Sequence, residues 1–192
     1  MKTILKNETK VVIANARLSY ANIFEPKAFE GQEPKYSVSL IIDKDDKDTI
    51  ALIEEAIENA VDQGKEKYWS GKRPGNLKLP LRDGDDERPD DENYQNAYFV
   101  NANSKNAPQV VGKEKDKATG KAISLGEDEV YSGCYANVSV NFFPYNNISK
   151  GISCGLGAIQ KESDGERLGG SFAKAEDDFD FVEVDSDDDF LV

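Results

Sequence analysis

Alternation of apolar and polar residues, repeated in four separate segments, is the feature that most constrains the fold of this chain. The segments are VVIANARLSY at 11–20, KYSVSLIID at 35–43, CYANVSVNFFPY at 134–145 and GISCGLGAIQK at 151–161. A period of two places successive side chains on opposite faces of a strand, so each segment is expected to bury one face. A weaker segment, AYFVNAN at 97–103, supplies a fifth strand. The chain is therefore predicted to be mainly β.

The alternation also assigns side chains to the core. The first strand is expected to turn one face inward, which consists of Val12, Ala14, Ala16, Leu18 and Tyr20. Tyr36 has the same inward phase in the second strand, while Phe24 and Phe29 are expected to cover the end of a barrel. The two cysteines, Cys134 and Cys154, fall on inner faces but far apart, so they are predicted to be buried free thiols.

One amphipathic helix is predicted between the second and third strands. Apolar residues recur there at spacings of three and four, at Ile50, Ile53, Ile57, Ala60 and Val61. Asp45, Asp46 and Asp48 are candidate N-caps, and Gly64, followed by Lys65 and Lys67, is expected at the C-terminal end. Two long polar loops, about 70–96 and 112–129, complete the domain.

The charge of the chain is strongly uneven. The formal net charge is −13, which by itself argues against a nucleic-acid-binding protein. However, residues 176–192 hold nine acids and no basic residue, and residues 83–92 hold seven acids and Arg88. The rest of the chain has 21 acidic and 23 basic side chains, so the body is nearly neutral and carries two acidic appendages.

Signals for catalysis and for bound cofactors are weak. The chain has no histidine, which excludes Ser-His-Asp and Cys-His arrangements and imidazole metal ligands. The segment ATGKAIS at 118–124 fails as a phosphate loop, because Lys115 upstream of it stands where glycine is needed and Ala122 stands where Ser or Thr is needed. DGDDERPDDE has Arg88 where an EF-hand needs glycine. We therefore expect no enzyme activity, cofactor or metal, and a solvated acidic loop at 83–92, with a loose divalent-cation site as the alternative.

A binding face is predicted on the outer side of the strand at 134–145, where aromatic rings alternate with small polar groups. Its candidate residues are Tyr135, Asn137, Asn141, Phe143 and Tyr145. Basic and aromatic candidates from elsewhere in the chain are Arg17, Lys35, Tyr68, Trp69, Lys72, Arg73, Lys78 and Arg82. Aromatic rings among positive charges on a curved sheet are typical of a single-stranded nucleic-acid groove, although each residue alone could be packing or ordinary surface.

Five strands with one helix predict an OB-fold-like, five-stranded Greek-key barrel. Several blocks, RLSYANIFEPKAFEGQEPKYSVSLIIDK, LKLPLRDGDDE, YSGCYANVSVNFFPYNN and KGISCGLGAIQKESDGERLGG, together resemble a family of bacteriophage single-stranded-DNA-binding proteins of OB fold. The resemblance spans about 17–170. It implies a protein of phage DNA replication or recombination that coats single strands in the host cytoplasm.

The acidic end of the chain has an apolar tip. Residues 172–192 are predicted to form a disordered tail behind a DNA-binding domain at 1–171. The tail ends in DDDFLV, and bacterial single-stranded-DNA-binding proteins have similar tails, with Pro-Phe where this chain has Leu-Val. We expect the tail to compete with DNA for the basic groove and its tip to dock on replication or recombination partners, through Asp187, Asp188, Asp189, Phe190, Leu191 and Val192. A plain solubility tail is the alternative.

Two other functions stay open from the sequence. An acidic DNA mimic would need its charge on the folded body, and a metal-dependent nuclease would use the carboxylates of 83–92. No apolar run approaches the ~20 residues of a membrane helix, so no membrane partner is expected. The oligomeric state, including a homo-oligomer, is left open.

Overall fold

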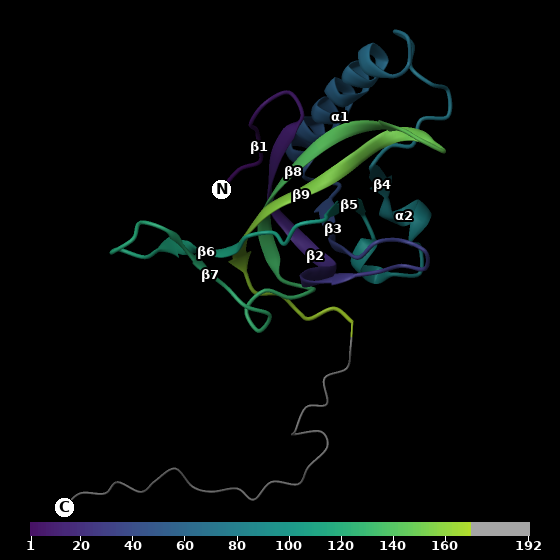
Figure 1. The fold of residues 1–192 in the computed structure, drawn as a ribbon. Coiled ribbons are helices and arrows are strands. Elements are labelled where there is room, and N and C mark those ends of the chain that lie inside the picture. Colours follow the sequence, from purple (N-terminus) through teal and green to yellow (C-terminus); the bar gives the residue numbers. More distant parts are fainter. Residues whose placement is uncertain (170–192) are drawn as a thin grey trace, which may run out of the picture.

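The computed structural model of the chain describes residues 1–169 and shows a closed barrel (Figure 1). The five barrel strands are β2 (Lys10–Lys27), β3 (Lys35–Asp43), β5 (Ala97–Ser104), β8 (Tyr135–Asn146) and β9 (Lys150–Ser163). Antiparallel pairings join them in the order β5–β3–β2–β8–β9, and a parallel pairing of Asn103 with Gly155 closes the ring. The prediction of a mainly β, OB-like barrel is confirmed, with all five expected strands in place.

Helix α1 (Lys47–Lys67) follows the second barrel strand, as predicted, and packs against β8 and β2. Asp46 is the N-cap, and its side chain accepts a hydrogen bond from the Thr49 amide at 3.2 Å. Gly64, predicted at the C-terminal end of the helix, lies in its last turn, and the helix continues to Lys67. The missing side chain of Gly64 leaves the space that the ring of Trp69 fills. No helix in residues 1–169 is long and apolar enough to cross a membrane.

Strand β2 changes phase twice, because two of its residues have a left-handed backbone. Asn15 has φ 54° and Tyr20 has φ 47°, and the pairing register shifts next to each of them. Val11 and Ile13 therefore point into the core and Val12 does not, while Tyr20 is 58% exposed. The inward assignments of Val12 and Tyr20 are wrong, because the bulges interrupt the strict period of two from which they were predicted.

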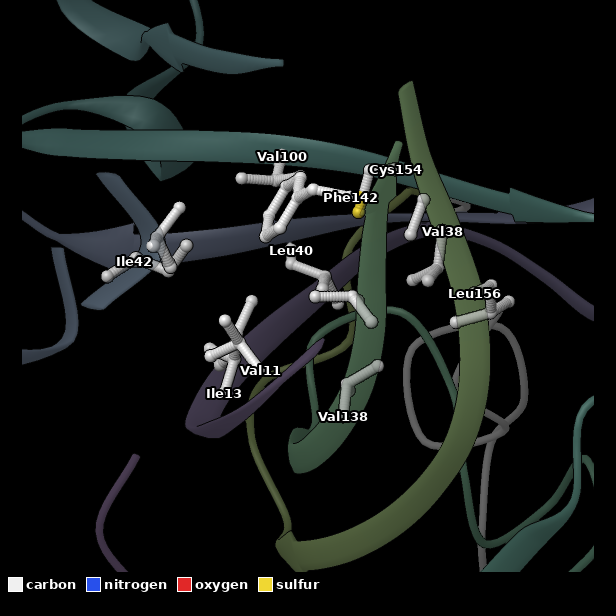
Figure 2. Close-up of a cluster of buried hydrophobic side chains, with 14 of the residues drawn as sticks. Val11, Ile13, Val38, Leu40, Ile42, Val100, Val138, Phe142, Cys154 and Leu156 are labelled. Carbon is white, nitrogen blue, oxygen red and sulfur yellow. The ribbon is translucent and has the colours of Figure 1, made fainter. Parts of the chain in front are cut away.

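The barrel interior is filled by the inner faces of all five strands (Figure 2). Val38, Leu40 and Ile42 of β3 alternate inward, in agreement with the period of two predicted for that segment. Phe142 pairs with Cys154 across β8 and β9. Both cysteines are buried free thiols, as predicted, and burial raises the pKa of each.

The aromatic residues assigned to the barrel end behave differently from one another. Phe24 packs against the core, whereas Phe29 is 59% exposed. Tyr36, predicted inward, is half-buried. The prediction is therefore wrong for Phe29, which lies in the connection between β2 and β3 and has no core strand to cover.

Both predicted loops contain secondary structure. The first holds β4 (Leu81–Asp83), α2 (Gly84–Glu87) and a 3₁₀ turn (Glu92–Tyr94). The second holds a hairpin of β6 (Val110–Lys115) and β7 (Ala122–Ser124), which projects from the barrel in Figure 1. The short β1 (Ile4–Leu5) pairs with β2. The acidic block at 83–92 is thus folded rather than a loop, although most of its acids are exposed to solvent as predicted.

The contact between Gly64 and Trp69 gives a stability prediction. A Cβ atom at residue 64 would lie 2.6 Å from Cη2 of Trp69 and 2.9 Å from Cβ of Pro144. Gly64→Ala should lower the free energy of unfolding by about 1–3 kcal/mol, because overpacking outweighs the gain of about 1 kcal/mol in helix propensity. Urea denaturation would measure this. The exposed neighbour Gln63→Ala is the matched control and should leave stability nearly unchanged or higher.

Candidate nucleic-acid interface

The outer face of β3 and β5 is divided into an apolar half and a polar half. Ile41 pairs with Phe99 in the apolar half, while Ser39 and Ser37 pair with Asn101 and Asn103 in the polar half. Tyr94 covers the apolar half and forms a small second core with Ile41, Ala97 and Phe99. Its hydroxyl donates a hydrogen bond to Oγ of Ser39 at 3.1 Å. The polar half remains open and becomes the floor of a groove.

This groove, called the outer groove below, has a volume of about 500 Å³. The residues that define it are Tyr20, Lys27, Phe29, Lys35, Arg88, Asn101 and Asn103. They come from β2, β3, β5, the connection between β2 and β3, and the acidic segment. Segments far apart in the sequence therefore meet on one face of the barrel.

Two exposed aromatic rings lie in the outer groove. Tyr20 is 58% exposed and Phe29 is 59% exposed, and each has a cation close to its face. The Nζ atom of Lys27 is 5.7 Å from the ring centre of Phe29, and the guanidinium carbon of Arg88 is 5.1 Å from that of Tyr20. An exposed ring beside a positive charge can stack on a base and contact its phosphate.

Arg88 fixes the position of the Tyr20 ring. Its guanidinium carbon also lies 5.0 Å from the ring centre of Tyr94 and 5.5 Å from that of Phe99. Tyr94 and Phe99 meet edge to face at 5.1 Å. Arg88 thus lies among three rings. It contacts both the Tyr20 ring and the Tyr94 and Phe99 rings of the second core.

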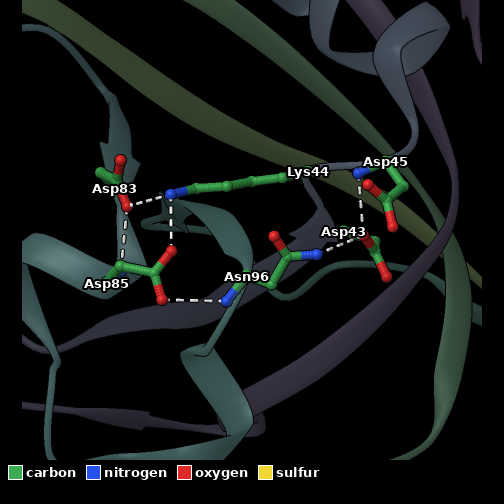
Figure 3. Close-up of polar contacts among 6 residues, drawn as sticks. All are labelled: Asp43, Lys44, Asp45, Asp83, Asp85 and Asn96. Atoms are coloured by element: carbon green, nitrogen blue, oxygen red, sulfur yellow. Dashed lines mark hydrogen bonds and ion pairs between the residues drawn. The ribbon is translucent and has the colours of Figure 1, made fainter.

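A second contact fastens the acidic segment to the barrel (Figure 3). The Nζ atom of Lys44, just after β3, lies 2.7 Å from a carboxylate oxygen of both Asp83 and Asp85. Asp85 also accepts a hydrogen bond from the Asn96 amide at 3.0 Å. The hydrogen bonds with Asp83 and Asp85 raise the pKa of Lys44, and the hydrogen bond from Lys44 lowers the pKa of both carboxyls.

This contact bears on the alternative of a divalent-cation site. Two of the acids that would form such a site, Asp83 and Asp85, already share an ammonium group. Within residues 1–169, no cluster of three or more Cys, Asp and Glu side chains could hold a metal ion.

The side chains of the outer groove have a net positive charge. Lys27, Lys35 and Arg88 outnumber Glu33, which pairs with Lys105 at 3.3 Å. An adjacent hollow shares Asn101 with the groove but is lined by acids as well as bases. In that hollow Arg82 is paired with Glu87 at 2.5 Å. The outer groove is therefore the better place for a polyanion.

Four of the predicted site residues come together in or beside this groove. Lys35 lines the outer groove, and Lys78, Arg82 and Tyr145 line the adjacent hollow. Asn141 and Phe143 are exposed on the outer side of β8. The binding face expected there from the sequence stays a prediction. Tyr68 and Lys72 are exposed just beyond the C-terminal end of α1.

Other predicted residues have structural roles in the described part of the chain. Trp69 is only 6% exposed, so its prediction as a stacking residue is wrong; it packs against α1. Asn137 is 4% exposed and donates hydrogen bonds to Gln160 and Glu162, so it does not offer its amide to a ligand.

Arg17, Arg73 and Tyr135 are also engaged within the protein. The guanidinium of Arg17 donates to the carbonyl oxygens of Gly133 and Glu166 and to Oδ1 of Asn93, and lies 5.9 Å from the ring centre of Tyr135. Arg73 donates to both carboxylate oxygens of Glu58 at 2.9 Å. The predicted tail residues Asp187, Asp188, Asp189, Phe190, Leu191 and Val192 lie outside the described residues.

The sequence reasoning missed most of the outer groove. The missed residues are Tyr20, Lys27, Phe29, Arg88, Asn101 and Asn103. One signal was available, because Asn101 and Asn103 alternate with the apolar residues of a predicted strand and so had to face outward. Arg88, a lone cation within seven acids, was a second signal.

A family model described as the single-stranded-DNA-binding protein of Enterobacter phage Enc34 matches residues 9–191. The matched range therefore includes nearly all of the acidic end. Protein p50 of Acyrthosiphon pisum secondary endosymbiont phage 1 is 28% identical over 188 residues, covering 95% of this chain and 98% of p50.

Solved structures of phage proteins share the fold. The Enc34 single-stranded-DNA-binding protein in complex with single-stranded DNA is 26% identical, with a TM-score of 0.70 over 87% of this chain and 93% of that one. The single-stranded-DNA-binding protein gp2.5 of bacteriophage T7 is 16% identical, with a TM-score of 0.54 over 90% of this chain and 97% of that one. The second likeness concerns the fold alone.

The Lys44 contact predicts how stability depends on pH. Asp83 and Asp85 have pKa values in the folded protein below the ordinary 3.8, so their stabilising effect is complete above about pH 4 and is lost as the pH falls through the lowered values. Lys44→Met removes the largest cause of both lowered pKa values, while the hydrogen bonds from the backbone amides of Asp85 and Asn96 remain, so this effect is smaller in the variant. The difference in melting temperature between the unmodified protein and Lys44→Met should be largest near neutral pH and shrink in acid. Thermal denaturation across a pH series would measure it.

Lys47→Met is the matched control, since Lys47 is an exposed lysine in the first turn of α1. It should follow the unmodified protein at every pH. A Lys44→Met difference that stays constant down to pH 2 would contradict the assignment.

Proposed function

The chain belongs to the family of the Enterobacter phage Enc34 single-stranded-DNA-binding protein, and we propose that it binds and coats single-stranded DNA through the outer groove. The observation that carries this proposal is the pair of exposed rings, Tyr20 and Phe29, each next to a cation on the outer face of the barrel. Two exposed rings with adjacent cations in one groove offer a stacking surface and a phosphate contact together.

The proposed binding mode follows from the groove chemistry. Bases stack on Tyr20 and Phe29, and the phosphates meet Lys27 and Lys35. The asparagine amides on the floor are able to hydrogen-bond to base edges of any sequence, because an amide both donates and accepts. Such binding tolerates sequence changes, as a protein that coats DNA requires. It also weakens with salt, because part of the affinity comes from phosphate contacts.

The family relationship also bears on the other functions considered. The relatives whose descriptions give a function are single-stranded-DNA-binding proteins, which supports binding rather than mimicry or cleavage. We propose a role without catalysis in phage DNA replication or recombination, in the host cytoplasm.

The acidic end is proposed to regulate the groove. Residues 176–192 carry nine acids, and a polyanionic segment of the same chain would compete with DNA for Lys27, Lys35 and Arg88. The tip, Asp187 to Val192, would dock on replication or recombination partners once DNA has displaced it from the groove. The domain would then span 1–171 and the tail 172–192.

Removing either ring should weaken binding. Tyr20→Ala and Phe29→Ala are each expected to lower the affinity for oligo-dT by about 1–3 kcal/mol, the value of one stacked base. Fluorescence polarisation of a labelled oligonucleotide would measure this, since Trp69 is buried and is a poor reporter. Phe143→Ala, which removes an exposed ring from β8, is the matched control. If only the control lost affinity, the binding face would be the one predicted on β8.

Removal of the tail should strengthen binding. A chain that ends at Lys174 is expected to bind oligo-dT about threefold to tenfold more tightly at low salt, with the difference disappearing at high salt. The same polarisation assay, run at two salt concentrations, would measure it. Equal affinities of the two forms at low salt would contradict competition between the tail and DNA. The role of the tail would then be partner docking or solubility.

A further inference from the structure

The acidic segment lies along the rim of the groove that is proposed to bind a polyanion. Asp90 and Glu92 line a hollow that shares Tyr20 and Arg88 with the outer groove. Asp86 lines the hollow that shares Asn101 with it. Negative charge therefore flanks the groove at two places, directly beside its stacking ring and its floor.

These three acids are not used to hold the fold together. Asp83, Asp85 and Glu87 pair with Lys44 and Arg82, and Asp91 accepts hydrogen bonds from Asn93. The side chains of Asp86, Asp90 and Glu92 are exposed and have no ion pair or hydrogen bond within residues 1–169. Their charge is therefore uncompensated and acts on whatever enters the groove.

The charges are also fixed in place. Lys44 holds the start of the segment, and Arg88 holds its middle among the rings of Tyr20, Tyr94 and Phe99. A mobile acidic loop would move away from a polyanion, whereas a fastened one must repel it. The repulsion acts within a Debye length of about 8–10 Å and is lost at high salt.

We propose that this acidic rim, formed by Asp86, Asp90 and Glu92, makes the groove selective for single-stranded over double-stranded nucleic acid. The inference rests on the proposed function of the outer groove. A single strand can place its bases on Tyr20 and Phe29 and its backbone over Lys27 and Lys35, away from the rim.

A duplex meets the rim at a disadvantage for two reasons. Its bases are already stacked and paired, so it cannot gain from the aromatic rings. It also carries one charge per about 1.7 Å of axis, twice the density of one strand, so its second backbone comes close to the fixed acids. The rim thus opposes the only attraction that a duplex has, which is between its phosphates and the basic side chains.

The test compares the affinities for oligo-dT and for a duplex of the same length. The rim variant is Asp86→Asn, Asp90→Asn and Glu92→Gln together. It should bind the duplex about tenfold more tightly at low salt and oligo-dT at most about threefold more tightly, because each screened charge contact is worth roughly a factor of two. The ratio of the two affinities should therefore fall.

The matched control removes three equally exposed acids from α1, as Glu54→Gln, Glu55→Gln and Glu66→Gln. It changes the net charge by the same amount but should leave the ratio unchanged. An equal fall in both variants would show an effect of net charge alone and overturn the proposal. An unchanged ratio in the rim variant would overturn it as well.

The unmodified protein is titrated first with oligo-dT. Failure to bind at that step would refute the proposed function itself, and so would be distinguishable from a failure of the rim. Melting temperatures of all three proteins should agree, since none of the substituted side chains has a partner in the described part of the chain. If the triple variant melted early, Asp90→Asn alone would carry the comparison, with a smaller fall in the same ratio expected.

Discussion

The barrel and its groove both depend on the two left-handed residues of β2. This strand is 18 residues long and must pair with β8 along its first half and with β3 along its second. A regular strand could not bend enough to serve both partners. The bulges at Asn15 and Tyr20 supply the bend, and each turns the next side chains to the other face. Asn tolerates this backbone well, whereas for Tyr20 it is an uncommon strain, held where the ring rests on Arg88. The same backbone conformation that is strained at Tyr20 also turns its ring outward.

The acidic segment stabilises the fold through its few apolar and cationic residues. Without Tyr94 the outer faces of Ile41 and Phe99 would be open to water, so the segment must lie on β3 and β5 for the second core to form. That position brings its carboxylates to the groove whether or not they bind anything there. Acids beside the groove weaken DNA binding, so their presence there is a disadvantage unless they also serve a function. Their separation into paired residues, which hold the segment, and unpaired residues, which face the rim, is consistent with a selective role.

Much of the fold was predictable because it rests on local periodicity. The five strands, α1, its N-cap region and the buried thiols all follow from the spacing of apolar residues. The phase of β2 was not predictable, since a bulge leaves no mark in a pattern of alternating residues. Trp69 was misassigned for a related reason. Its ring is buried because Gly64 has no side chain, and the pattern of the sequence does not show that these two residues are in contact. The groove residues were missed because Tyr20 was placed in the core and Arg88 in a solvated loop.

The net charge of −13 and an anionic ligand are compatible because electrostatic forces in salt are local. A phosphate bound in the outer groove lies nearest to the side chains that line it, and there Lys27, Lys35 and Arg88 outnumber Glu33. Charges farther away act more weakly, because salt screens them over about 10 Å. The remaining acids act only if they come within that distance. The rim acids lie at the edge of the groove, because Lys44 and Arg88 fasten the segment that carries them, and the acidic end is proposed to be displaced when DNA binds. A fixed repulsion can distinguish one ligand shape from another, whereas a transient one can only change how tightly every ligand binds. The two acidic stretches of this chain are therefore proposed to have different tasks, selectivity and occupancy, although both are negatively charged.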